Sequence, residues 1–280
     1  MIEKVSIIIP THNRKNLLTR AIESLLAQSY NCLEIIVVND ASSDGTDEFM
    51  VNLIKEEPRL RYYRNAIPKG APSSRNLGIL NATGKFVTFL DDDDEMLPDK
   101  IEVMLKNFKA DYSMVATGYF EQKIDRKKAI IPKRIVKLED LLYYYPLGGG
   151  NQMLTLRFYA LQIGGFDESL TAYQDYDFWL RIVKVFGNGI CIQEPLSIIH
   201  MEHEMGRITT SPRRFLGAYS FYLKHKGIMT EKQRRYQLYL LMLLRKRRIS
   251  LRQFVYMVPL RFWRIRYKYL VLCYFPFLSK

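Results

Sequence analysis

The first third of the chain alternates short apolar runs with amphipathic segments. Four runs rich in Val, Ile, Leu, Phe and Tyr predict buried strands, at residues 5–9, 33–38, 60–63 and 86–90. Three helices are predicted between them, after the polar turn 11–13 and over residues 46–57 and 73–80. Alternating β and α units predict an α/β fold with a mostly parallel, twisted sheet and helices on both faces.

The second half of the chain is less regular. The expected elements are a hairpin near residues 112–134, a glycine-rich turn at 148–150, a helix over 173–186 and a strand near Ile190. From Pro212 onward the pattern is helical and rich in Leu, Tyr and Arg.

We therefore predict one domain over residues 1–210, followed by a basic, amphipathic helical C-terminal region over residues 211–280. Within the domain, residues 1–95 form one half and residues 96–210 the other.

The net charge of +13 is concentrated near the C-terminus. Residues 231–280 contain thirteen Lys or Arg and one acid, a balance of +12. Residues 1–230 contain 29 basic and 28 acidic residues, a balance of +1. The body of the protein is therefore nearly neutral, whereas its C-terminal region is a polycation.

In this C-terminal region, Arg and Lys interleave with Leu, Tyr, Phe and Trp263, which is typical of segments that lie in the interface of anionic membranes. Its longest uncharged run, residues 269–279, has eleven residues and is shorter than a spanning helix. We expect peripheral attachment to an anionic membrane surface through residues 231–280. The alternative is a packing module or a homo-oligomer contact with a solvated basic face.

The three cysteines, Cys32, Cys191 and Cys273, lie far apart and show no CxxC spacing. Their spacing argues against a disulfide framework and against a cysteine-based zinc site, and it fits a reducing cytosol. The first apolar run is short and is broken by Pro10, so we expect no secretory signal. The expected location is the cytoplasm, at the inner face of the cell membrane.

Three polar loops follow predicted strands, at residues 11–14, 40–45 and 91–95. In parallel sheets ligands bind beyond the carboxyl ends of the strands, where such loops converge. The third loop begins with four aspartates, Asp91 to Asp94, and gathering like charges after a buried strand costs energy unless a cation neutralises them. Mg²⁺ or Mn²⁺ bridging a nucleotide diphosphate fits this cluster. The alternative is an acidic surface loop that caps the helix beginning near Pro98.

Six motifs follow one another along the chain. They are Ser-Ile-Ile-Ile-Pro-Thr-His-Asn-Arg (6–14), Ile-Val-Val-Asn-Asp-Ala-Ser-Ser-Asp-Gly-Thr (36–46), Ser-Arg-Asn-Leu-Gly-Ile (74–79), Phe-Leu-Asp-Asp-Asp-Asp (89–94), Gly-Gly-Phe-Asp-Glu-Ser-Leu (164–170) and Gln-Asp-Tyr-Asp-Phe-Trp-Leu-Arg (174–181). In this order they resemble the motifs of the family 2 glycosyltransferases with the GT-A fold. The resemblance covers about residues 4–210, and an ordered set is more specific than any one motif.

The resemblance implies that residues 1–95 are a nucleotide-binding half and residues 96–210 an acceptor-side half. Thr11 and Asp40 would hold the base, with the Asp40 carboxylate accepting from a uracil ring N–H. Arg75 would approach the diphosphate at the start of its helix, where its charge and the backbone N–H groups both favour an anion. Asp91 would lie near the ribose and phosphates. Asn13 and Asp92 complete the expected nucleotide-binding set.

The same resemblance places the metal on the sequence. Asp91-Asp92-Asp93 corresponds to the DXD motif, with Asp93 as the direct metal ligand, and the extra acid Asp92 leaves the register open. His203 and Arg207 are similar to a late family segment in which a histidine approaches the metal or the diphosphate. His200 competes with His203 for that role.

An inverting transfer needs a base that accepts the proton of the acceptor hydroxyl. By the resemblance this base is Asp175, whereas Asp177 lies two residues on and would point elsewhere on a helix. The alternative is a helix N-terminal acid stabilised by the macrodipole, which accounts for one such aspartate more easily than for two.

The sequence therefore predicts an inverting, metal-dependent glycosyltransferase that moves a sugar from a nucleotide-diphosphate donor, with UDP favoured by the resemblance, to a lipid-linked or polysaccharide-precursor acceptor. Another nucleotide-using α/β enzyme, such as a sugar nucleotidyltransferase, is a weaker fit because the expected glycine- and lysine-rich first loop is missing. Nucleic-acid binding through the basic tail would leave the acidic cluster unexplained, so we expect no nucleic-acid partner.

Overall fold

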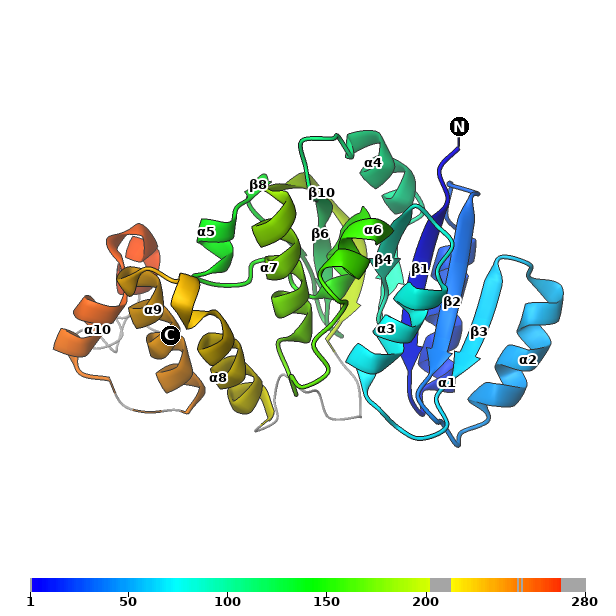
Figure 1. Cartoon of the computed structure of the whole chain (residues 1–280), viewed down its shortest axis with the longest axis horizontal. Helices are drawn as coiled ribbons and strands as arrows, with labels where there is room; N and C mark the ends of the chain where they lie inside the picture. The colour runs from blue at the N-terminus through cyan, green and yellow to red at the C-terminus, as the bar shows by residue number, and fades with distance from the viewer. Residues whose placement is uncertain (1, 202–212, 246, 248, 268–280) are drawn as a thin grey trace. The chain divides into compact units, whose positions relative to one another are not determined.

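The computed structural model describes residues 2–201, 213–245, 247 and 249–267, which fall into two compact units (Figure 1). The first unit contains the described residues of 1–141, 145–169 and 174–206, and the second those of 142–144, 170–173 and 207–280. The predicted boundary between residues 210 and 211 falls outside the described residues and stays a prediction.

The first half of the first unit follows the predicted βα alternation. The predicted strands and helices are present, and their predicted ends differ from the observed ones by one or two residues. They are β1 (Val5–Thr11), α1 (Lys15–Leu26), β2 (Leu33–Asn39), α2 (Thr46–Glu56), β3 (Leu60–Arg64), α3 (Ala71–Asn81) and β4 (Phe86–Phe89).

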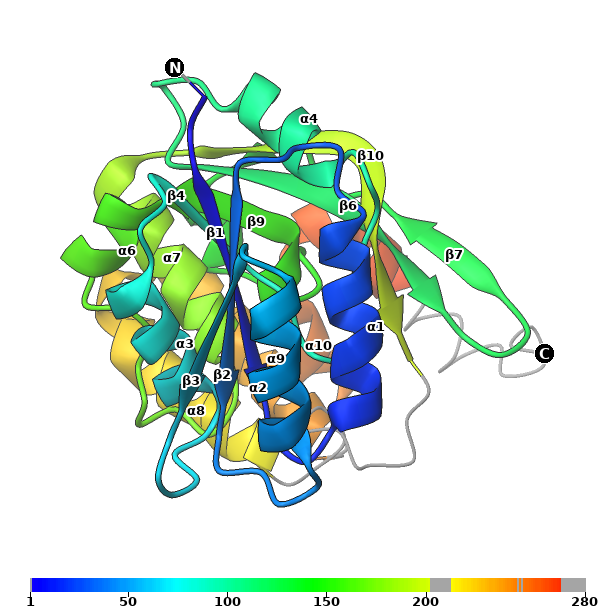
Figure 2. The same cartoon turned by 90° about the vertical axis from the view of Figure 1, so that its right-hand side faces the viewer.

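Helices cover both faces of these strands, as Figure 2 shows for α1 and α3 on either side of β1. Ile7 and Ile9 of β1 belong to the same buried cluster as Leu18 of α1. The intervening residue, Ile8, faces α3, where a Cβ on Gly78 would lie 2.4 Å from Ile8 Cγ2. Successive side chains of a strand point to opposite faces, so β1 is apolar on both sides and completely buried.

The second half of the first unit contains elements that the sequence pattern predicted only in part. The hairpin, the helix ending at Phe186 and the last strand are confirmed, whereas a short strand and helix after the glycine-rich turn were not predicted. The elements are β5 (Glu95–Met96), α4 (Lys100–Asn107), β6 (Met114–Gln122), β7 (Lys127–Ile130), β8 (Ile135–Val136), α5 (Leu138–Leu141), the 3₁₀ turn η1 (Gly150–Gln152), β9 (Met153–Leu156), α6 (Arg157–Gln162), α7 (Gln174–Phe186) and β10 (Gly189–His200).

One mixed sheet of the described residues joins these halves, in the strand order β3-β2-β1-β4-β9-β6-β10-β5. Strands β1 to β4 pair in parallel, and β6 pairs in parallel with β10. The short strand β9 lies antiparallel between β4 and β6. Because both neighbours oppose β9, β4 and β6 run in the same direction. The carboxyl ends of β1, β2, β4, β6 and β10 therefore share one edge of the sheet.

The second unit is helical where it is described, with α8 (Arg213–His225), α9 (Glu231–Leu244) and α10 (Leu251–Met257). Capping boxes start α9 at Thr230 and α10 at Ser250, each with a Gln at the third helical position. A small aromatic core gathers Tyr143, Tyr236 and Phe254. Within the described residues, no helix has the length and apolar character needed to cross a membrane.

Candidate functional site

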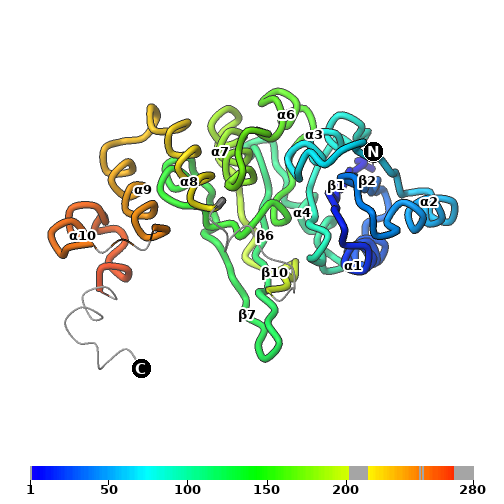
Figure 3. Tube along the Cα trace, turned by 90° about the horizontal axis from the view of Figure 1, so that it is seen from below, coloured from blue at the N-terminus to red at the C-terminus, as the bar shows by residue number. Residues whose placement is uncertain are grey.

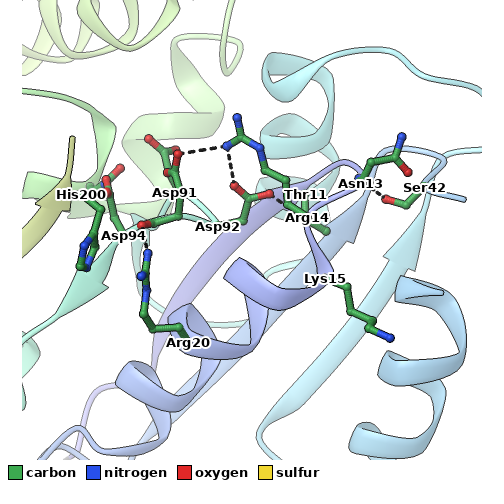
Figure 4. Close-up of polar contacts among 12 residues, drawn as sticks. Thr11, Asn13, Arg14, Lys15, Arg20, Ser42, Asp91, Asp92, Asp94 and His200 are labelled. Carbon is green, nitrogen blue, oxygen red and sulfur yellow. Dashed lines mark hydrogen bonds and ion pairs between the residues drawn. The ribbon is translucent and has the colours of Figure 1, made fainter. Parts of the chain in front are cut away.

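The three polar loops predicted to converge do meet at the carboxyl edge of the sheet. Thr11, the last residue of β1, donates a hydrogen bond from Oγ1 to Asp92 Oδ2 over 2.8 Å. The backbone N–H of Asn13 donates to Ser42 Oγ over 2.9 Å, which joins the loops after β1 and β2 (Figure 4). The convergence follows from the parallel pairing of β1 with both β2 and β4.

The four aspartates after β4 divide into two sets. Oxygens of Asp91, Asp93 and Asp94 all lie within 4.8 Å of one another, so these three side chains form one carboxylate cluster. Asp92 faces Thr11 and Arg14 instead (Figure 4). The grouping therefore contains both outer acids of the expected DXD motif, and it adds Asp94.

Three arginines surround the cluster. Arg14 contacts both Asp92 and Asp93 at 3.0 Å through Nη1. Arg20 of α1 donates to the backbone oxygen of Asp93 over 2.6 Å, and Arg75 of α3 contacts Asp91 Oδ1 at 2.6 Å. Burial opposes the charge of Arg14, but the neighbouring carboxylates of Asp92 and Asp93 outweigh it and raise the Arg14 pKa.

Asp92 and Lys100 show how costly charge is in this part of the protein. Burial raises the pKa of Asp92 to about 6, against the opposing effect of Arg14. Lys100, at the start of α4, is completely buried, and burial lowers its pKa to about 7 although Asp94 favours its charge. Its Nζ donates to the backbone oxygen of Asn151 and to Ser197 Oγ. A lysine that sequence analysis would place in solvent is therefore part of the interior.

Asp94 is held by groups distant in sequence. It accepts from Asn151 Nδ2 of η1 and, over 3.0 Å, from the backbone N–H of His200 at the end of β10. His200 also contacts Glu95 Oε1 at 2.6 Å. His200 thus lies beside the acidic loop, whereas its competitor His203, and Arg207, fall outside the described residues.

Asp40 and Arg75 border the same edge of the sheet. Asp40 is buried, and its carboxylate accepts from Asn65 Nδ2 at 2.7 Å and from the backbone N–H groups of Lys69 and Gly70. These bonds fix the loop that leads into α3. The buried Arg75 Nε has no hydrogen-bond partner among the described residues, so this guanidinium keeps donor capacity next to Asp91.

Asp175 lies in the first turn of α7, half-buried, where it accepts from the N–H of Tyr176 over 2.8 Å. Burial raises its pKa, Arg75 opposes the rise and the charge of Asp91 adds to it. Asp175 is therefore electrostatically connected to the metal-ligand candidate Asp91 across the site. A Cβ on Gly150 would lie 3.8 Å from Asp175 Cβ, so η1 runs alongside this acid.

Asp177 has a different environment although it is only two residues away. Its side chain is completely buried and contacts Arg181 Nε at 2.7 Å. Arg181 in turn donates to the backbone oxygens of Ile163 and Gly165. Asp177 and Arg181 therefore connect α7 to the turn after α6. Asp177 thus points away from the environment of Asp175, as its position two residues on predicts.

Sequence reasoning missed several residues of this site. Asp94 was included in the predicted acidic cluster but was given no role of its own, and Arg14 was included in the first motif without a role. Lys100 and Asn151 carry no local signal, because their roles depend on contacts with residues at least 51 positions away. The described structure thus adds a buried support to the carboxylates that the sequence identified.

Replacing Arg14 with Met should destabilise the metal-free protein by about 1–3 kcal/mol near pH 7, since it strands two carboxylates. The loss should be smaller below about pH 6, because Asp92, whose pKa is raised to about 6, is then protonated and no longer needs the charge of Arg14. Urea unfolding in EDTA at both pH values measures this, with Lys15→Met as the control. A loss independent of pH would contradict the assigned role of Arg14.

Solved structures with this fold contain nucleotide-sugar ligands. The chain superposes on the Staphylococcus aureus TarS 1–349 complex with UDP-GlcNAc with a TM-score of 0.61 at 18% identity, over 78% of this chain and 66% of that one. It also matches the mannosyltransferase PcManGT of Pyrobaculum calidifontis, in complex with GDP-Man and Mn²⁺, with a TM-score of 0.63 at 17% identity, over 100% and 83% of the two chains. At these identities the likeness establishes the GT-A fold.

Sequence comparison is more specific. A protein of Escherichia coli K12, provisionally named the colanic acid biosynthesis glycosyl transferase WcaA, is 32% identical over 92% of this chain and 94% of its own length. A GalNAc(5)-diNAcBac-PP-undecaprenol beta-1,3-glucosyltransferase of Campylobacter jejuni is 42% identical over 40% of this chain and 37% of its own. The family model Glycosyl transferase family 2 matches residues 6–172. The chain therefore belongs to glycosyl transferase family 2, and the protein is a glycosyltransferase.

Proposed function

We propose that this glycosyltransferase inverts the anomeric centre as it moves a sugar from a UDP-sugar to a hydroxyl of a lipid-linked or polysaccharide-precursor acceptor. The observation that carries the proposal is the carboxylate cluster of Asp91, Asp93 and Asp94 at the carboxyl edge of the sheet. Arg75 and Asp175 border this cluster, so charged groups suited to a diphosphate and to proton transfer stand together.

The cluster fits a hard divalent cation. Its three carboxylates offer oxygens within 4.8 Å of one another, and oxygen is the donor that Mg²⁺ and Mn²⁺ prefer. We assign Asp93 and Asp91 to the metal, with Asp94 beside them, and His203 remains a candidate ligand. When bound, the cation would neutralise the charge that develops on the departing diphosphate.

The donor nucleotide would lie over the loops after β1 and β2. Thr11, Asn13 and Asp40 are assigned to the base and ribose, and Arg75 to the diphosphate. The convergence of these loops supports the assignment, as does the open donor capacity of Arg75 Nε. TarS complexes with UDP and UDP-GlcNAc support uridine, whereas PcManGT binds GDP-Man. Asp92 would support the nucleotide site indirectly, because its carboxylate accepts hydrogen bonds from Thr11 and Arg14.

Asp175 is the proposed general base. Its carboxylate would accept the proton of the acceptor hydroxyl as that oxygen attacks the anomeric carbon, opposite the departing diphosphate. Burial raises its pKa, which makes it a better proton acceptor than an exposed aspartate. Arg75 opposes this rise in pKa and favours the ionised carboxylate that a base requires.

The acceptor class is supported by the relatives. The C. jejuni enzyme is named for a PP-undecaprenol substrate, and the E. coli relative for colanic acid, a polysaccharide.

A lipid-linked acceptor requires the enzyme to work at a membrane. The second unit supports this, because exposed apolar side chains stand among its arginines. Leu260 is 74%, Trp263 61% and Tyr267 65% exposed, which is typical of a peripheral, interfacial segment. A homo-oligomer contact through the same helices is the competing role.

Donor hydrolysis tests the enzyme class and the metal together. Purified protein should release UDP from one of a panel of UDP-sugars in the presence of Mn²⁺ or Mg²⁺, and EDTA should stop the reaction. Asp93→Ala should abolish metal-dependent donor binding and leave the fold intact, because it also relieves acidic repulsion. Full activity of this variant, with unchanged metal dependence, would end the assignment of Asp93.

Replacing Asp175 with Asn should lower kcat by about 10²-fold or more with donor affinity nearly unchanged, because the amide cannot accept the proton. In the wild type, turnover should fall as the pH drops through the raised pKa of Asp175, since the protonated acid is no longer a base. Asp177→Asn is the matched comparison: it should lower the stability that Arg181 provides and spare kcat per folded molecule. Equal loss of kcat in both variants would contradict the assignment.

The membrane role of the second unit predicts that Leu260→Ser/Trp263→Ser/Tyr267→Ser weakens binding to phosphatidylglycerol vesicles by about tenfold or more, since buried apolar area is lost. High salt should weaken the binding of the wild type to these vesicles but should not abolish it. Vesicle co-sedimentation measures both effects. The control Ile54→Ser/Leu80→Ser/Phe158→Ser removes exposed apolar side chains of the first unit and should bind normally. Unchanged binding of the first variant would favour the packing or oligomer role.

A further inference from the structure

A basic β-hairpin extends from the first unit, outside the carboxylate site. Strands β6 and β7 pair from Tyr119–Ile130 to Gln122–Lys127, and the N–H of Lys123 donates to Arg126 O over 2.9 Å to close the turn. Figure 3 shows this hairpin reaching beyond the other elements of the first unit. We call residues 123–134, which contain its tip and its return strand, the basic arm.

The arm is charged in a part of the chain that is neutral on average. It contains six Lys or Arg and one acid, a balance of +5 in twelve residues, whereas residues 1–230 together reach only +1. Arg126, Lys127 and Lys128 are exposed, and none of them is ion-paired with an acid in the part of the chain that the structure describes. Lys133, nearer the end of the arm, contacts Asp140 at 3.5 Å, so the charge available to an external partner is that of Arg126, Lys127 and Lys128.

The tip of the arm is apolar as well as basic. The Ile124 side chain is 90% exposed at the turn, and Ile131, just after β7, is 40% exposed. Lys127 Nζ lies 4.4 Å from the centroid of the Phe120 ring, so the aromatic face and the cation are presented together. An exposed apolar tip within a basic strand suits an interface that is apolar inside and anionic at its surface.

The root of the arm stands next to the carboxylate cluster. Gln122, where β6 ends, is paired with His200, where β10 ends, and its backbone oxygen accepts from the N–H of Met201 over 2.9 Å. The N–H of His200 donates to Asp94. Two hydrogen bonds on consecutive residues therefore link the base of the hairpin to the cluster. The arm leaves the sheet at the edge that carries the site.

We propose that the basic arm binds the surface of an anionic lipid bilayer, with Ile124 entering the headgroup region. This contact is independent of the one proposed for the second unit. It would hold the site edge of the sheet against the membrane, where a lipid-linked acceptor presents its sugar. Only the presentation of the site to a lipid-linked acceptor rests on the proposed function, because binding of the arm to lipid requires neither donor nor acceptor.

The test uses the full chain and co-sedimentation with vesicles of phosphatidylglycerol and phosphatidylcholine. The variant Arg126→Gln/Lys127→Gln/Lys128→Gln should bind the vesicles at least about tenfold more weakly than the wild type. Each basic residue near such a surface raises the partition coefficient roughly fivefold. Ile124→Asp should also weaken partition. All four side chains are exposed, and an unchanged far-ultraviolet circular dichroism spectrum would show that the variants are folded.

A charge-matched control removes three exposed lysines from the opposite edge of the sheet. Lys55 lies in the last turn of α2, which leads to β3, and Lys106 and Lys109 lie at and just after the end of α4, which leads to β6. Lys55→Gln/Lys106→Gln/Lys109→Gln should partition as the wild type does. Equal partition of the arm variant and this control would overturn the proposal.

The alternative partner is a polyanionic glycan, for which heparin serves as the probe. If the arm variant kept its vesicle binding and lost only heparin binding, the lipid proposal would be overturned in favour of an acidic polysaccharide. Failure of the donor-hydrolysis screen would leave the arm proposal untouched, since partition is measured without substrate. Conversely, normal metal-dependent hydrolysis with unaltered partition of the arm variant would leave the proposed function standing alone.

Discussion

Mutual repulsion among Asp91, Asp92, Asp93 and Asp94 is the constraint on which the site depends. Four acids in succession after a buried strand would raise the energy of the folded state unless cations and hydrogen-bond donors surrounded them. The first unit supplies these from several elements. Arg14 precedes α1, Arg20 lies within it and Arg75 lies in α3. The packing of α1 and α3 on the sheet therefore also brings the arginines that neutralise the acids into place.

The acids do not share this support equally, and the difference separates the structural role of Asp92 from the chemical role proposed for the other three. Asp92 turns inward, where Thr11 and Arg14 satisfy both its oxygens. It therefore fixes the end of β1 against the end of β4. Asp91, Asp93 and Asp94 stay together on the other side, so their mutual repulsion is only partly relieved by protein groups. In the proposed metal site this remaining repulsion would favour a divalent cation, whereas complete neutralisation by arginine would remove that attraction.

The sequence was sufficient for the parts of this architecture that depend on local pattern. β1, β2 and β4 are continuous apolar runs because helices cover both faces, and their order with α1, α2 and α3 follows from alternation. It was insufficient where tertiary contacts decide. The four-residue strand β9 has no pattern of its own, and its place between β4 and β6 reverses the direction of pairing. Lys100 has the sequence context of a solvated helix start, yet its ammonium is enclosed by Asn151 and Ser197.

The average charge of residues 1–230 also hides a feature that depends on the tertiary structure. The near neutrality of residues 1–230 suggests a body without a preferred orientation in an electric field, but the basic arm concentrates positive charge at the edge of the sheet that carries the acids. Screening at physiological salt limits each charge to a range of about 8 Å, so a nearby surface responds mainly to the charges that face it. An anionic bilayer attracts the basic arm and repels the carboxylate cluster. If both act, the arm meets the surface while the cluster stays in the aqueous layer, where a nucleotide donor can reach it.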